Sequence, residues 1–295
     1  MKKTNLGILF GLSTYLCWGF LSLFWKLLAG VNAYNTLSYR ILFTSLTMLV
    51  YMIFSGRSKV YKEELSNLFK NPKAALTMLF ASLLISINWL VYIYAVGHGQ
   101  ATEASLGYYI MPLVSVGLSV IFLRESLNNA VRLAILVAGI GVLVLVINTG
   151  NLPLVSLALA LSFGLYGLVK KSVSLSSDVA MLVESLIILP FALIYLLFFA
   201  KEGMQDYNSL ENSLLVLSGA VTAIPLLFFA EALKRAPLNL IGFIQYINPT
   251  IQLAIAVLVF QEGITAGELK GFIFIWSAIA IFVIGQLLEM RKRSS

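Results

Sequence analysis

The chain has 295 residues, of which 60% are hydrophobic and 11% charged, and its formal net charge is +7. Soluble domains carry about 25% charged residues, and a soluble fold of this length could not hide so much apolar surface. The composition therefore excludes a soluble protein and predicts a polytopic membrane protein embedded in the lipid bilayer. Because the basic residues lie in short loops between apolar runs, nucleic acid is not an expected partner.

The start of the chain is similar to a secretory signal peptide, because Lys2 and Lys3 precede an apolar stretch. This stretch continues to Trp25 without a convincing cleavage site, so we expect a retained first helix. Crossing a bilayer takes about 20 apolar residues, and ten runs of the sequence are long enough. In chain order they are 5–27, 34–54, 74–96, 101–122, 130–148, 153–170, 179–199, 213–233, 238–260 and 267–288. Because they are apolar all round, these runs predict helices rather than the alternating strands of a membrane barrel.

The longest polar gap between the runs spans 55–73 and predicts a short surface helix. Most lysines and arginines fall in this gap, in every second loop after it, and in a basic segment at each end of the chain. Positively charged loops face the cytoplasm. We therefore expect both termini in the cytoplasm, which an even number of spans also requires.

Two stretches of the sequence, 95–127 and 232–264, align when one is shifted by 137 residues, the difference between 232 and 95. Three pairs then coincide: Tyr109 with Tyr246, Pro112 with Pro249, and Glu125 with Glu262. A proline inside a helix removes one backbone hydrogen bond and bends the helix, so Pro112 and Pro249 are predicted hinges.

This alignment divides the chain into two halves of five helices each, 1–149 and 150–295, within one integrated transmembrane domain. Because five is odd, the second half enters the membrane from the opposite side. The sequence therefore predicts an all-α integral membrane fold of ten transmembrane helices, built as two inverted-topology repeats. In transporters, such repeats place the substrate site between the halves, near the midplane of the membrane.

Arg40 and Glu184 are charges within apolar runs, and aligning SYRILFTSL with LVESLIILP places them opposite each other in the repeat. Charges inside a membrane are costly and generally face a cavity or a partner. One interpretation is that each residue lines a half-channel on its own side. The alternative is a structural anchor, which is paired or reaches to the membrane interface.

Three further titratable residues lie near the ends of apolar runs. Glu103 either pairs with a nearby cation or favours a helix N-terminus, and Glu231 is expected to pair with Arg235 four residues later. His98 is either a solvated turn residue or a sensor of external protons. These three residues and Glu184 are the candidate coupling groups if protons drive transport, although nothing in the sequence requires proton coupling.

Polar and aromatic residues gather at the depth of the two prolines. Together with Arg40, the predicted substrate-binding set contains Tyr15, Trp18, Asn88, Tyr92, Tyr108, Tyr109, Gln245, Tyr246 and Gln252. A largely aromatic pocket with few hydrogen-bonding groups is typical of small-molecule sites. The alternative is packing between helices, which the same residue types mediate in membranes. The second copy has Gln245 and Asn248 where the first has Tyr108 and Met111, so we expect the run 238–260 to select the substrate.

Motifs for other kinds of activity are missing from the sequence. There is no G-x-x-x-x-G-K-[ST] loop, no HExxH, no GxSxG and no channel-filter motif. A single histidine and a single cysteine argue against a Cys/His metal centre. We therefore expect no enzyme activity, no cofactor and no bound metal.

Several motifs resemble the EamA branch of the drug/metabolite transporter superfamily, and in particular its RarD group. They are NWLVYIYAVGHGQATEASLGYYIMPLVSVGLSVIFLRE (88–125), YLCWGFLSLFWKLL (15–28), LSYRILFTSL (37–46), SFGLYGLVKK (162–171), ESLIILP (184–190) and VTAIPLLFFAEALKRAPLNLIGFIQYINPTIQL (221–253). The resemblance covers essentially the whole chain. Met111 departs from it, because the group has asparagine before the first proline, as Asn248 stands before Pro249.

The resemblance implies a multi-pass permease of the bacterial cytoplasmic (plasma) membrane, from a group associated with chloramphenicol sensitivity. Our leading hypothesis is a secondary transporter that exports a small amphipathic metabolite or drug-like molecule by alternating access. One alternative is an uptake permease or facilitator. Another, from a different class, is a membrane scaffold or sensor without transport.

Overall fold

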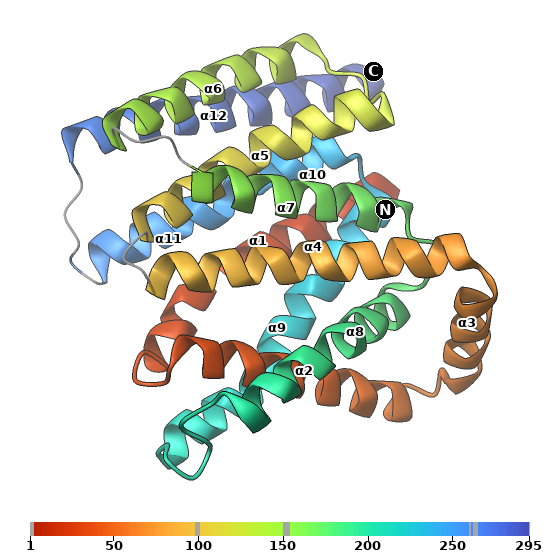
Figure 1. Ribbon diagram of the computed structural model, residues 1–295. Coiled ribbons are helices and arrows are strands. Elements are labelled where there is room, and N and C mark those ends of the chain that lie inside the picture. The colour runs from red at the N-terminus through yellow and green to blue at the C-terminus, as the bar shows by residue number, and fades with distance from the viewer. Residues whose placement is uncertain (1–2, 98–100, 150–153, 260, 262–264, 295) are drawn as a thin grey trace.

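The computed structural model describes residues 3–97, 101–149, 154–259, 261 and 265–294, which form helices and short loops without a strand (Figure 1). The helices are α1 (Lys3–Leu27), α2 (Ala33–Phe54), α3 (Ser58–Lys70), α4 (Pro72–Gly97), α5 (Ala101–Leu123), α6 (Asn129–Thr149), α7 (Leu154–Ser172), α8 (Ser177–Phe198), α9 (Ser209–Arg235), α10 (Leu238–Ile244), α11 (Ile247–Leu258) and α12 (Ala266–Ser294). Within these ranges, nine helices are long and apolar enough to cross a membrane. The short α3 confirms the helix predicted for the gap 55–73.

The span expected at 238–260 is divided between α10 and α11, so ten continuous spanning helices are not found in the described residues. At the division, the Tyr246 N–H donates to the Phe243 carbonyl over 3.3 Å, and the Asn248 N–H donates to the Gln245 carbonyl over 3.1 Å. Both bonds reach back three residues rather than the four of an α-helix. The backbone is therefore tightened for about one turn.

The two prolines of the repeat have different local effects. Pro249 has no N–H to donate to Gln245, so it removes the bond that would have continued α10 into α11. By contrast, α5 runs through Pro112 as one helix. The Tyr109 hydroxyl, from the turn before Pro112, donates to the Pro249 carbonyl over 3.2 Å. The two proline-bearing segments therefore lie against each other inside the protein.

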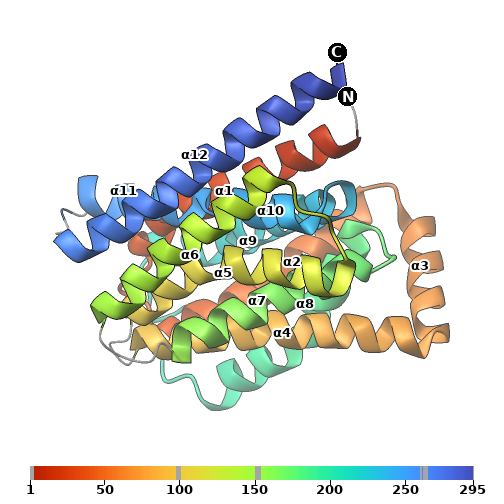
Figure 2. The same cartoon turned by 90° about the horizontal axis from the view of Figure 1, so that it is seen from above.

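The helices pack as a layered bundle (Figures 1 and 2). In Figure 1, α6 and α12 lie side by side at the top, and α2 packs against α8 and α9 at the bottom. Between them, α1 packs against α9, α10 and α11, while α7 packs against α4 and α5. Both views place α3 at the end of the bundle where α1 begins. This end carries the basic polar gap that was expected to face the cytoplasm.

Two close approaches between helices recur in the register of the repeat. A Cβ atom at Gly19 would lie 2.7 Å from the Cβ of Ile251, and one at Gly164 would lie 2.7 Å from a methyl carbon of Val114. Positions 114 and 251 differ by 137 residues, as do the two prolines. Glycine thus lets α1 meet α11 in the same way that it lets α7 meet α5.

A closer approach, against backbone atoms, is between α9 and α2. A Cβ atom at Gly219 would lie 2.3 Å from the carbonyl carbon and oxygen of Phe43. The Thr44 hydroxyl also donates to the Gly219 carbonyl over 3.4 Å. Because the obstacle is backbone rather than a flexible side chain, α9 must move away from α2 to admit even one methyl group.

We therefore expect Gly219→Ala to destabilise the folded protein by about 1–3 kcal/mol, the usual cost of overpacking. The matched control is Gly139→Ala in α6, where a Cβ atom would meet nothing within 4 Å. There, alanine should be neutral or stabilising by about 0.5–1 kcal/mol, because glycine is a poor helix former. Thermal unfolding of the two variants in detergent checks this, and equal melting temperatures would contradict the packing.

Candidate substrate-binding site

A cavity of about 390 Å³ lies among helices of both halves: α1, α2, α4, α5, α7, α9 and α11. It brings together most of the predicted substrate-binding set, namely Trp18, Arg40, Asn88, Tyr92, Tyr108, Gln245 and Gln252. Residues from distant parts of the sequence therefore share one cavity that combines aromatic rings with several polar groups, a mixture that can bind a small molecule.

Other lining residues were not in the predicted set. From α1 these are Leu21, Ser22, Trp25 and Lys26, followed by Ala29 just after the helix; from the other helices they include Trp89, Met111, Thr222 and Asn248. The α1 residues follow Trp18 at steps of three or four, the spacing of one helix face, and this signal would have identified Trp25. Thr222 carries no comparable signal. Lys26 and Ala29 are exposed, so the cavity reaches the surface where α1 ends.

Arg40 is held by aromatic rings. Its guanidinium carbon lies 4.1 Å from the centroid of the Trp89 ring and 5.4 Å from that of the Trp25 ring. Cation–π contacts of this kind contribute about 0.5–2 kcal/mol, and more as water is excluded. No ion pair among the described residues includes Arg40, and its Nε is buried without a hydrogen-bond partner. Arg40 thus faces the cavity without an acidic partner.

The uncharged groups of the lining are held by neighbouring helices. Asn88 donates through Nδ2 to the Leu159 carbonyl, over 2.9 Å, and to the Ser162 hydroxyl, over 3.0 Å, which fixes its amide against α7. The rings of Tyr92 and Tyr108 meet edge to face, with centroids 6.0 Å apart. These contacts orient the polar side chains before any ligand arrives.

On α11, Gln252 Nε2 donates to Asn248 Oδ1 over 3.0 Å, so two amides one turn apart form a pair beside the cavity. Gln245, at the division between α10 and α11, is the third amide side chain that this segment contributes to the lining. The segment therefore supplies more hydrogen-bonding groups to the lining than its counterpart α5, whose Met111 contributes none.

Three predicted residues lie beside the cavity but not on its lining. Tyr15 is buried against Trp18, with ring centroids 5.6 Å apart. Tyr109 is buried, and its hydroxyl bonds to Pro249 as described above. Tyr246 packs against Phe243 at 5.6 Å, and its hydroxyl is buried without a partner. Adjacent positions of a helix point about 100° apart, so Tyr108 faces the cavity while Tyr109 faces another helix.

Glu184 is paired, and its side chain borders a separate void of about 10 Å³ rather than the main cavity. Its carboxylate accepts a hydrogen bond from Lys170 Nζ over 2.6 Å and another from the Tyr166 hydroxyl over 3.1 Å. The Lys170 and Glu184 side chains are only 3% and 4% exposed. We expected Lys170 in a basic loop, but α7 continues to Ser172 and Lys170 is one of its buried residues. The ion pair agrees with the structural-anchor alternative, in which the charge of Glu184 is paired.

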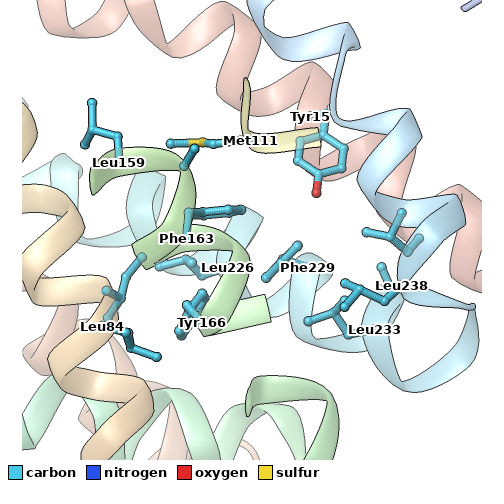
Figure 3. Packing of buried hydrophobic residues seen from close by; sticks show 14 of the residues in the cluster. Tyr15, Leu84, Met111, Leu159, Phe163, Tyr166, Leu226, Phe229, Leu233 and Leu238 are labelled. Atoms are coloured by element: carbon cyan, nitrogen blue, oxygen red, sulfur yellow. The ribbon is translucent and has the colours of Figure 1, made fainter. Parts of the chain in front are cut away.

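An aromatic cluster formed by Phe163 and Tyr166 of α7 and Phe229 of α9 (Figure 3) lies beside this ion pair. The rings of Tyr166 and Phe229 are nearly parallel, with centroids 6.0 Å apart, and Phe163 packs on Phe229 at 5.4 Å. Phe163 and its neighbour Leu226 line the cavity, whereas the Tyr166 hydroxyl reaches Glu184. The cluster therefore borders the cavity at Phe163 and, at Tyr166, the ion pair between α7 and α8.

Polar contacts also close the end of the bundle where α1 begins. Lys171 Nζ donates to the Ala236 carbonyl over 2.6 Å. The Glu125 carboxylate accepts the backbone N–H groups of Leu238 and Asn239, over 2.8 and 2.9 Å. These contacts tie α7 and the loop after α5 to the chain between α9 and α10. The cavity is thus open at one end and sealed at the other.

Of the remaining candidate coupling groups, Glu231 is the one whose side chain the structure describes, and it lies away from the lining. Glu231 pairs with Arg235, as predicted, and also accepts a hydrogen bond from the Ser177 hydroxyl. Glu103 belongs to the first turn of α5, but its side chain, like the whole of His98, lies outside the described residues. In the part of the chain that the structure describes, no acidic residue lines the cavity, and no cluster of His, Cys, Asp and Glu resembles a metal site.

Known proteins are similar to this chain in sequence and in fold. Residues 5–147 match the model of the EamA-like transporter family. The "Uncharacterized transporter YojE" of Bacillus subtilis (strain 168) is 42% identical, over 99% of this chain and 98% of its own length. "Protein RarD" of Escherichia coli (strain K12) is 38% identical, over 99% of both chains. A solved crystal structure with 18% identity has a TM-score of 0.73 and covers 96% of this chain and 98% of its own.

The relatives align over almost the full length, so the likeness includes both halves and every helix that lines the cavity. The composition, the helical fold and these matches agree with one another. The chain belongs to the EamA-like transporter family, within the drug/metabolite transporter superfamily that the RarD proteins represent.

Proposed function

We propose that the protein is a secondary transporter, a permease that moves a small amphipathic metabolite or drug-like molecule across the bacterial cytoplasmic membrane by alternating access. One observation carries the proposal: a cavity lined by aromatic and polar residues reaches the surface at one end and is sealed at the other by Phe163, Tyr166 and the Lys170–Glu184 pair. A carrier in one of its two states has this shape.

The packing of the helices supports two inverted five-helix repeats, 1–149 and 150–295, if α10 and α11 are counted as one broken span. The largest contacts then have counterparts after exchange of the halves. The pair α1–α9 corresponds to α7–α4, and α2–α9 corresponds to α8–α4. The matching glycine contacts of α1 with α11 and of α7 with α5 follow the same rule. Alternation follows if the two halves exchange conformations.

The charge distribution supports an orientation for this state. The sealed end carries Lys3, Lys171, Lys234 and Arg235, and basic loops favour the cytoplasm. We infer that both termini are cytoplasmic and that the cavity opens to the outside. Opening the sealed end would separate Lys170 from Glu184, which makes Glu184 the first of the proposed coupling groups to examine if protons drive the cycle.

Export is the leading direction, and an uptake permease or facilitator is the alternative within transport. A scaffold or sensor without transport is the alternative from another class. The two classes differ in one respect, because only a transporter must expose the same cavity residue to both sides of the membrane.

This difference gives the test. Cys17 is the single cysteine, so Cys17→Ser provides a background in which Gln245→Cys marks the cavity. We expect a membrane-impermeant thiol reagent to modify position 245 from the outside in intact cells and from the inside in inverted vesicles. Ser119→Cys is the control, because Ser119 is fully buried and should react from neither side. Reaction at position 245 from one side alone would contradict alternating access.

A further inference from the structure

We propose that the molecule which binds in this cavity is an organic anion: its carboxylate, or a similar planar oxyanion, pairs with Arg40, and its apolar or aromatic body lies among Trp18, Trp25 and Trp89. The proposal rests on the transporter function argued above and names the chemical class of the substrate. Its first ground is the unpaired charge of Arg40.

An arginine guanidinium stays charged in proteins and presents N–H groups in a planar fork that matches a carboxylate. Arg40 lies within α2, one of the spanning helices, yet among the described residues it makes no ion pair and its Nε has no hydrogen-bond partner. A charge inside a membrane is costly unless it is paired. The rings of Trp25 and Trp89 offset part of this cost but accept no hydrogen bond from the fork. An anionic ligand would supply the missing partner.

The charge of the whole lining points the same way. Lys26 is the second cation of the lining, and in the described part of the chain neither Asp nor Glu faces the cavity. Electrostatic attraction grows as water is excluded and the local dielectric constant falls. A cationic molecule would meet repulsion from the Arg40 guanidinium there, while a monoanion would meet attraction.

The rest of the lining indicates the chemical character of the remainder of the ligand. Three tryptophans give broad apolar faces, which suit a ring or a branched alkyl group. The amides of Asn248 and Gln252 lie one turn apart and offer both donors and acceptors. The cavity therefore fits a molecule with one acidic end, an apolar body and one or two neutral polar groups.

The test compares molecules that differ only in the charged group. The probes are phenylacetate, phenylacetamide and phenethylamine, and a second set built on the 3-methylbutyl group: isovalerate, isovaleramide and isoamylamine. Because three of the four tryptophans line the cavity, the intrinsic fluorescence of the purified protein reports binding directly. We expect at least one acid to bind about 10- to 100-fold more tightly than its amide, the value of a hydrogen bond to a charged group, and its amine to bind least.

Variants of the protein test whether Arg40 causes the preference for the acid. Arg40→Gln should remove the preference for the acid, whereas Arg40→Lys, which keeps the charge but not the fork, should retain part of it. The matched control is Arg132→Gln, at an exposed position of α6 outside the cavity, and it should bind like the unmodified protein. If Arg40→Gln fails to fold, the comparison of Arg40→Lys with Arg132→Gln carries the test.

Three results would overturn the proposal. The first is that neither acid binds, and the second is that the amides or the amines bind as well as the acids. The third is that Arg40→Gln keeps the preference for the acid. A failure of the transporter function has a different signature. In that case the acid binds through Arg40, but the radiolabelled acid does not cross the membrane of vesicles that contain the protein. Conversely, vesicles that carry the amide in preference to the acid would retain the transporter and exclude the anion.

Discussion

Replacing Lys170 by methionine while Glu184 remains is expected to destabilise the folded protein by about 3–5 kcal/mol, the cost of leaving one charge buried without its partner. The pair is almost completely removed from solvent, and its two charges are 2.6 Å apart. In the variant, Glu184 would keep only the hydrogen bond from the Tyr166 hydroxyl. That single neutral donor cannot replace an ammonium group.

A second substitution distinguishes the loss of the ion pair from a loss of packing as the cause of the destabilisation. Glu184→Leu in the Lys170→Met background should recover most of the loss, because well-packed apolar residues often replace a buried ion pair at little cost. Arg57→Met is the matched control, since it breaks the Arg57–Asp178 pair, in which Arg57 is 40% exposed. Exposed pairs contribute about 0–1 kcal/mol. Unfolding in detergent measures all three variants, and a loss in Lys170→Met no larger than in Arg57→Met would contradict this account.

The helices were predictable from the sequence because each must satisfy its backbone within the membrane and present apolar side chains to lipid. Their expected ranges agree closely with α1, α2, α4 to α9 and α12, and the polar gap 55–73 does contain α3. The proline register also marked correctly the segments that meet, since Tyr109 bonds to Pro249. Hydropathy and spacing are sufficient for these features because both depend on local sequence.

Features that depend on how helices rotate against one another were not predictable. Hydropathy does not tell whether Tyr108 or Tyr109 faces a cavity, because both neighbours are aromatic. The ion pair of Lys170 and Glu184 joins two helices, and the basic residue was expected in a loop. The break before Pro249, with Pro112 accommodated in an intact helix, shows that the same residue in two repeats can have different backbone effects. Such differences arise from packing partners that one sequence does not reveal.

Arg40→Leu is expected to reduce transport about 30-fold or more. Removing one partner of a desolvated charge pair costs at least about 2 kcal/mol in binding, and the substrate is proposed to be the other partner. The change also removes the cation from its place above Trp89 without adding bulk to the cavity. Because leucine suits a spanning helix, the variant should still fold and accumulate in the membrane. Arg132→Leu, at an exposed position outside the cavity, is the matched control.

The central claim is that this cavity carries a substrate through the membrane. Mass spectrometry of small organic acids inside and outside cells tests it most directly, in strains that produce the unmodified protein, Arg40→Leu, Arg132→Leu or none, at equal amounts in the membrane. We predict that at least one acid changes its distribution with the unmodified protein and with Arg132→Leu, but not with Arg40→Leu. The claim is contradicted if Arg40→Leu acts like the unmodified protein, or if the unmodified protein leaves every distribution as it is in cells that lack it.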